Sequence, residues 1–177
     1  MELLQELSAL GWRTSNTGGE ALARKQDGDR LLEVIVQKFV LLNGVKLALS
    51  VSASSKEFCK VCAKVADWEN THATLCQTYL ENLYADLSKV NVQSISDEIE
   101  SWWMSQSLED AIKSKSQPPP ETGLAQLYHL AALAYLGDFN TLMDYQQVFA
   151  KGQRMGFVPM IESEMIDRAV DIALERA

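Results

Sequence analysis

The stretch "RLLEVIVQKFVLLNGVKLALSVSA" at residues 30–53 decides the fold of this chain. Its first half, residues 30–41, is rich in Val, Ile, Leu and Phe, as is typical of a strand inside a sheet. In residues 45–53 apolar side chains alternate with polar ones, which predicts a half-buried strand. Asn43-Gly44 lies between the two and is a strong hairpin signal, because both positions of such a turn need positive φ. The stretch therefore predicts an antiparallel hairpin.

The residues before the hairpin add a helix and a further strand. Leucines at helical spacing in residues 2–10, followed by Gly11, predict a short amphipathic helix. Residues 20–26 form a third candidate strand, which ends at the turn signal Asp-Gly-Asp of residues 27–29. The first lobe, residues 1–54, is thus predicted to be an N-terminal helix followed by a three-stranded antiparallel meander.

The chain after residue 54 is predicted to be helical. Ser54 and Glu57 have the spacing of a capping box and would open a helix over 55–68. Further helices are predicted at 71–88, 96–115 (with a restart at Ser107), 124–136, 139–151 and 162–176. A proline-rich linker is predicted at 116–121, since three consecutive prolines cannot lie inside a helix. The fold class is therefore α+β, a single domain with two lobes, 1–54 and 55–177.

Composition limits the classes of function. The net charge of −8 argues against a protein that binds nucleic acid, because phosphate binding needs a basic face. No segment approaches the length of a membrane span, and the N-terminus has no signal-sequence pattern, so we expect no membrane partner. Three cysteines without a secreted-type framework indicate a reducing compartment. We expect a cytoplasmic protein.

All three cysteines lie in one stretch with a histidine. Cys59, Cys62, His72 and Cys76 have the spacing Cys-x2-Cys-x9-His-x3-Cys, which could supply four zinc ligands. On a helical wheel, however, Cys62 lies in the middle of an apolar face and Cys59 at its edge, while the charged residues share the opposite arc. Buried thiols in a helix core are the ordinary interpretation, so we expect no metal. A structural zinc remains the alternative, and a redox motif lacks its usual sequence context.

No set of catalytic side chains is evident. His72 and His129 are the two histidines, and no Ser-His-Asp or Cys-His arrangement can be argued from them. Gly18-Gly19 lacks the lysine of a phosphate-binding loop. We therefore expect a protein that is not an enzyme and carries no cofactor.

An acidic and aromatic segment is the candidate partner-binding site. It comprises Asp97, Glu98, Glu100, Trp102 and Trp103. Adjacent helical residues point about 100° apart, so one tryptophan should pack inside while the other reaches the surface. An aromatic anchor beside acidic residues would suit a basic protein partner. The alternative is that both tryptophans pack between the lobes.

The C-terminal third resembles a known family over residues 124–174. The residues that carry the resemblance are Leu136-Gly137-Asp138, Tyr145, Phe149, Gly156-Phe157-Val158-Pro159 and Met165-Ile166-Asp167-Arg168-Ala169. This segment resembles immunity proteins of bacterial contact-dependent growth inhibition systems. The resemblance implies a cytoplasmic inhibitor that binds and neutralises a cognate toxin domain, often a basic nuclease, by occluding its active-site cleft.

A secretion chaperone is the alternative function. Type III chaperones are also small and acidic, and they begin with a helix followed by a meander. They usually have more strands after the second helix, whereas this chain is predicted to stay helical, and that difference favours the toxin inhibitor.

Overall fold

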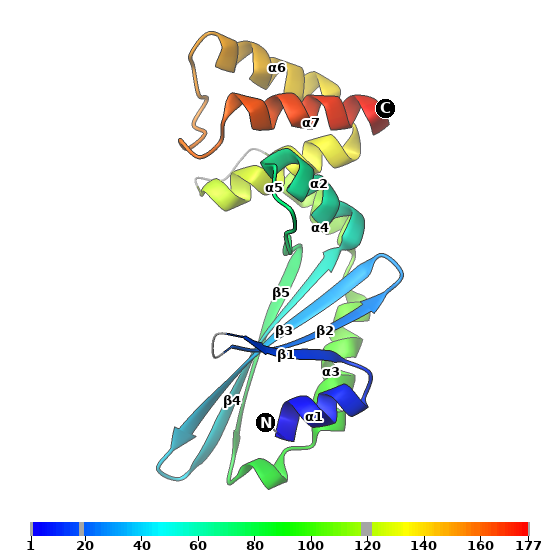
Figure 1. The fold of residues 1–177 in the computed structure, drawn as a ribbon, viewed down its shortest axis with the longest axis vertical. Coiled ribbons are helices and arrows are strands. Elements are labelled where there is room, and N and C mark those ends of the chain that lie inside the picture. The colour runs from blue at the N-terminus through cyan, green and yellow to red at the C-terminus, as the bar shows by residue number, and fades with distance from the viewer. Residues whose placement is uncertain (1, 18–19, 118–121, 177) are drawn as a thin grey trace. The chain divides into compact units, whose positions relative to one another are not determined.

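The computed structural model describes residues 2–17, 20–117 and 122–176 (Figure 1). The chain forms two compact units, and neither is a continuous segment. Unit 1 contains Met1–Ser54 and Thr74–Gln106, and unit 2 contains Ser55–Ala73 and Ser107–Ala177. The α+β class predicted from the sequence is confirmed.

Unit 1 is built on a five-stranded antiparallel sheet with the strand order β1-β2-β3-β4-β5. Its elements are α1 (Glu2–Ala9), β1 (Arg13–Thr17), β2 (Glu20–Asp27), β3 (Arg30–Leu41), β4 (Gly44–Ser55), β5 (Cys76–Tyr84), the short 3-10 helix η1 (Leu87–Lys89) and α3 (Val92–Ser105). The strands β1 and β5 are the two edges. The hairpin predicted from residues 30–53 is confirmed as β3 and β4.

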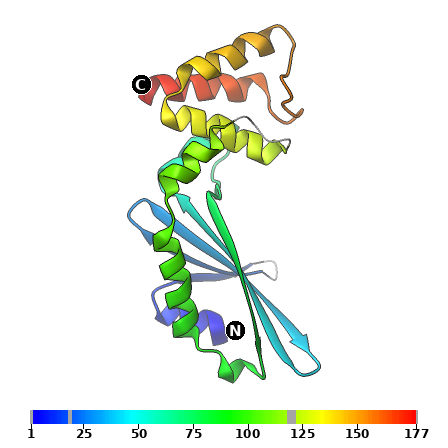
Figure 2. The same cartoon turned by 180° about the vertical axis from the view of Figure 1, so that it is seen from behind.

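The core of unit 1 lies between one face of this sheet and the helices α1 and α3, which pack against each other (Figure 2). Side chains at alternate strand positions, such as Ala23, Val34 and Leu49, are buried on this face. Polar contacts hold α3 in place: the indole N–H of Trp12 donates to Ser96 Oγ (2.9 Å). One face of the sheet is therefore covered by helices.

Two strands of the sheet were not predicted. Residues 71–88 were expected to be a helix, but they contain β5, which pairs with β4 from Val45↔Tyr84 to Ala53↔Cys76. The prediction failed because exposed Tyr79 and Leu83 add apolar residues on the outer side of an edge strand and hide its alternation. The strand β1 was also missed, since its sequence RTSNT is polar throughout.

The turn between β3 and β4 differs from the predicted one. It is formed by Leu42 and Asn43, and of the residues 43 and 44 only Gly44 has positive φ (157°). A Cβ atom on Gly44 would lie 2.3 Å from the carbonyl oxygen of Tyr84. Glycine is needed here because β5 approaches the backbone closely, not because the turn has two positive φ angles.

Unit 2 consists of helices. They are α2 (Lys56–Ala66), α4 (Leu108–Lys115), α5 (Gly123–Leu136), α6 (Phe139–Ala150) and α7 (Ser163–Arg176). The helix α5 is central, with residues 126–134 buried, and it packs against α2, α4, α6 and α7. The predicted buried helix over 124–136 and the restart at Ser107, whose hydroxyl accepts a hydrogen bond from Asp110 N (3.3 Å), are confirmed.

The start of α2 is one residue later than predicted. Ser55, and not Ser54, is the N-cap, and its hydroxyl accepts a hydrogen bond from Phe58 N (3.1 Å). Asp67 in the left-handed conformation ends the helix. None of the described helices is long and apolar enough to cross a membrane. Of the predicted linker 116–121, residues 118–121 lie outside the described residues.

Candidate protein-binding surface

The face of the sheet opposite α3 carries apolar side chains that no described helix of unit 1 covers. We call it the open face and define it by Leu22, Ile35, Tyr79 and two ion pairs, Arg24–Glu33 and Lys46–Glu81. Leu22 and Ile35 are direct neighbours across β2 and β3, and they alternate with buried Ala23 and Val34 on the covered face. Leu22 and Ile35 are only half-buried, and Tyr79 on the edge strand β5 is exposed.

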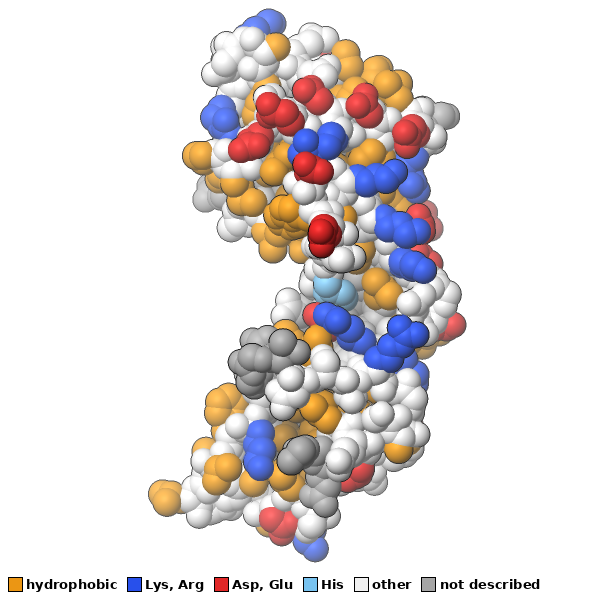
Figure 3. Space-filling model, viewed as in Figure 1, with side chains coloured by type: hydrophobic (Ala, Val, Ile, Leu, Met, Phe, Trp, Pro, Cys, Tyr) orange, Lys and Arg blue, Asp and Glu red, His pale blue; other side chains and the backbone are white. Residues whose placement is uncertain are grey.

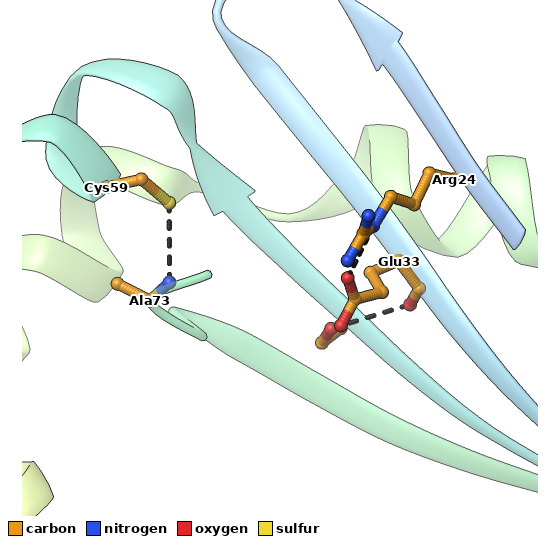
Figure 4. A network of polar contacts seen from close by, with 5 residues as sticks. Arg24, Glu33, Cys59 and Ala73 are labelled. Carbon is orange, nitrogen blue, oxygen red and sulfur yellow. Dashed lines mark hydrogen bonds and ion pairs between the residues drawn. The ribbon is translucent and has the colours of Figure 1, made fainter. Parts of the chain in front are cut away.

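The charges on the open face are internally paired. Arg24 Nε lies 2.7 Å from Glu33 Oε2 (Figure 4), and Lys46 Nζ lies 2.7 Å from Glu81 Oε1. Lys46 also lies over the ring of Phe39. Pairing leaves little net charge on this face, so a partner would meet aliphatic and aromatic groups framed by neutralised ion pairs.

A second exposed apolar cluster lies at the end of the β3–β4 hairpin. We call it the apolar tip and define it by Phe39, Val40, Leu41, Leu42 and the neighbouring Leu83 of β5. Leu42 in the turn is fully exposed (109%), and Val40 is 76% exposed. The first four residues are consecutive, so both sides of the hairpin end are apolar.

The five predicted partner-binding residues all lie on α3, but they differ in accessibility. Trp103 is only 2% exposed and belongs to the core, whereas Trp102 is half-buried, so the prediction that one tryptophan packs inside is confirmed. Glu100 is engaged by Lys25 Nζ (2.7 Å) and by Ser96 Oγ. Asp97 and Glu98 are exposed. The accessible part of this group is therefore Asp97, Glu98 and Trp102.

Glu98 of this acidic group lies near the end of the edge strand β5. Burial, and then the charge of Glu98, raise the pKa of Tyr84 at the end of β5. Glu98 and Trp102 are one turn apart on α3 and share a side of the helix. An acidic and aromatic surface thus adjoins the end of β5.

Cys59 and Cys62 are placed as the helical wheel predicts. Phe58, Val61, Cys62 and Val65 form the buried face of α2, together with Cys59 and Ala66. The sulfur of Cys59 accepts a hydrogen bond from Ala73 N (3.3 Å), as Figure 4 shows. Burial, followed by the neighbouring Cys59, raises the pKa of the Cys62 thiol well above its usual range. Such a thiol is a poor nucleophile.

The four residues of the alternative zinc site, Cys59, Cys62, His72 and Cys76, do not come together as a metal site. His72 and Cys76 follow α2, in the segment before β5 and at the first residue of β5. Across residues 2–17, 20–117 and 122–176, no three His, Cys, Asp or Glu side chains come together in a way that could hold a metal ion.

His129 is a buried structural histidine in unit 2. Its Nδ1 lies 3.0 Å from the carbonyl oxygen of Lys115, which can only accept, so Nδ1 carries the proton. Nε2 therefore accepts from the hydroxyl of Tyr145 (3.0 Å). Burial lowers the pKa of His129 and favours the neutral ring. Both ring nitrogens are engaged in hydrogen bonds within unit 2, and neither is left to act on a substrate.

The exposed apolar residues of the sheet were missed as functional candidates from the sequence. Val40 lies in the predicted strand 30–41 and Leu42 directly after it, while Tyr79 and Leu83 lie in the predicted helix 71–88. In such segments apolar residues need no special explanation. One signal was available: the run Phe39 to Leu42 breaks the alternation that a half-buried strand shows beside a turn. Recognising it requires knowing that no layer covers the hairpin end.

The comparisons with known proteins yield one match. A family model described as a family of unknown function, DUF6990, matches residues 1–174. Neither a curated protein nor a solved structure matches the chain. Because the match extends over nearly the whole sequence, the chain belongs to the DUF6990 family.

Proposed function

We propose that the protein is a non-catalytic binding protein that holds a segment of another polypeptide against the open face of unit 1, as a secretion chaperone does. The observation that carries this proposal is the open face itself. An antiparallel sheet with helices on one side normally has polar residues on the other. Here Leu22, Ile35 and Tyr79 lie there among polar residues such as Ser50 and Gln77, beside charges that are already paired. A surface of this kind favours a protein ligand.

The order of elements also supports a chaperone. The sequence-based argument against this class was that such chaperones usually have more strands after the second helix, whereas this chain was predicted to stay helical. The strand β5 follows α2 and completes the sheet, which weakens that objection. Unit 1 together with α2 has the following order of main elements: a helix, a meander, a second helix, a further strand and a third helix.

Charge favours a basic partner. Residues 74–106, which contain β5 and α3, carry five acidic residues and one lysine. The exposed Asp97 and Glu98 would attract a basic segment toward the edge strand, and this attraction would weaken with added salt.

Neutralisation of a toxin domain is the second candidate. The acidic and aromatic group of Asp97, Glu98 and Trp102 favours it, because it adjoins the edge strand and suits the basic cleft of a nuclease. The resemblance over residues 124–174 points the same way. In this case the partner would be a folded domain, and not an extended segment.

Co-expression with the products of neighbouring genes tests both candidates. A stoichiometric complex should form, and Tyr79→Asp on the open face should weaken it, while Leu174→Asp, an equally exposed change on α7, should not. If the bound region is an extended N-terminal segment of the partner, the chaperone proposal is supported. If co-expression instead rescues growth from a toxic domain, the inhibitor is supported. A complex that is indifferent to Tyr79→Asp would contradict the role of the open face.

A further inference from the structure

The apolar tip has more exposed apolar surface than a solvated hairpin end should have. Figure 3 shows hydrophobic side chains gathered where the β3–β4 hairpin ends. Together the five residues leave on the order of 600 Å² exposed, at the upper limit for a patch on a monomeric protein. A row of exposed apolar side chains of this size favours association, here with Lys38 and Lys46 beside it.

Local charge indicates what can cover the apolar tip. The whole chain has a net charge of −8, so most surfaces of two copies repel each other. Residues 37–46 are an exception, since they contain Lys38 and Lys46 and no acidic residue. Glu81 is paired with Lys46, so its charge is largely compensated. Two copies can approach here without meeting like acidic charges.

The same charges separate this surface from the one used for the proposed partner. A basic partner is attracted to Asp97 and Glu98 on α3, and the lysines near the tip would disfavour it at the hairpin end. A second copy of the chain supplies an apolar patch of matching size, in which Lys46 is paired with Glu81 and Lys38 is the one further charge within residues 37–46. It is the occupant that the observations favour.

We propose that two copies of the chain associate through their apolar tips in a closed, two-fold dimer. In such an interface the same patch is used by both copies. Two patches of this size would bury at most about 1,200 Å² in total, which is at the lower limit of specific interfaces. The dimer should therefore be reversible, and it leaves Tyr79 and the Leu22–Ile35 pair of the open face available to a partner.

Sedimentation equilibrium of the full chain tests the proposal without any knowledge of the partner. The wild-type protein should show a monomer–dimer equilibrium. The Leu42→Asp variant should weaken dimerisation by at least about tenfold. Because Leu42 is fully exposed, this change removes no contact within the monomer, and the circular dichroism and melting temperature should stay unchanged. Leu174→Asp on α7 is the matched control and should dimerise like the wild type.

Salt gives an independent check. Screening reduces the repulsion between two acidic copies and leaves apolar burial intact, so the dimer should become tighter as salt is added. The complex with a basic partner should respond in the opposite direction. The two salt dependences, of dimerisation and of binding to a basic partner, are measured independently. A wrong result for one leaves the other standing, so the dimer and the proposed function can be judged separately.

Several results would overturn the dimer. They are a wild-type protein that stays monomeric at all concentrations, a dimer that Leu42→Asp leaves intact, a dimer that salt weakens, and open-ended association. Sedimentation with phosphatidylcholine vesicles covers one more outcome. If the protein is monomeric and binds these vesicles through Leu42, the apolar tip contacts a lipid surface and no second copy.

Discussion

Replacing Gln126 by Met should destabilise the loop between α6 and α7 in unit 2. The side chain of Gln126 is 1% exposed and connects α5 to this loop through two hydrogen bonds. Its Nε2 donates to Gly156 O (3.0 Å), and its Oε1 accepts from Val158 N (2.8 Å). Methionine has a similar volume and can make neither bond.

The expected loss follows from these two bonds. Each contributes about 0.5–1.5 kcal/mol, so the free energy of unfolding should fall by about 1–3 kcal/mol. The loop keeps its side-chain hydrogen bonds from Arg154 to the carbonyl oxygens of Phe157, Val158 and Ile161, so it should loosen without unfolding unit 2. Faster hydrogen exchange at Val158 N would report the local change.

Urea denaturation and amide exchange are the measurements. Gln147→Met is the matched control, because Gln147 is an exposed residue of α6, and such changes usually stay within about 0.5 kcal/mol. If Gln126→Met and Gln147→Met have the same stability and the same exchange at Val158, the two hydrogen bonds do not hold the loop, and the reasoning is refuted.

Three further predictions concern pH, packing and thiol chemistry. Burial lowers the pKa of His129 in the folded protein below its value in the unfolded chain. The neutral ring therefore contributes fully to the free energy of unfolding above pH 6.5, and this contribution is lost as the pH falls toward the folded pKa. The loss of stability on the acid side should be smaller in His129→Gln. Gly44→Ala should lower stability by about 1–3 kcal/mol in thermal unfolding, because the added Cβ meets Tyr84 O at 2.3 Å; a wild-type melting curve would contradict this. In native protein, mass spectrometry after alkylation should find Cys62 labelled more slowly than half-buried Cys76, and equal rates would show that burial does not protect it.

Local sequence patterns correctly predicted the elements that have one solvent-exposed face and one buried face. The face of α2 that carries Cys62 could be assigned from a wheel because charged residues fill the other arc. The hairpin of β3 and β4 could be assigned because alternation and an Asn-Gly signal coincide, although the turn lies one residue earlier. The buried character of α5 followed from its nearly uniform apolar composition.

Patterns failed where tertiary context decides. The edge strand β5 has apolar residues on both sides, and only its pairing with β4 distinguishes it from a helix. The open face could not be recognised, because whether Tyr79 is exposed depends on which layer covers the sheet. On α3, the sequence could identify an inside and an outside tryptophan, but it could not show that Lys25 engages Glu100.

Residues 55–73, which contain α2, belong to unit 2 but interrupt the sequence of unit 1, and this has a consequence for biosynthesis. A ribosome that has released residues 1–54 has produced a sheet without its last strand, and β5 emerges only after the whole of α2. The apolar side of α2 then stays uncovered until α5 and α7, against which it packs, have been synthesised. Cutting the gene after residue 106 would yield a complete sheet joined to an uncovered apolar helix, so such a fragment should aggregate. Because each unit is made of two stretches of sequence, no single cut in the gene yields both units complete.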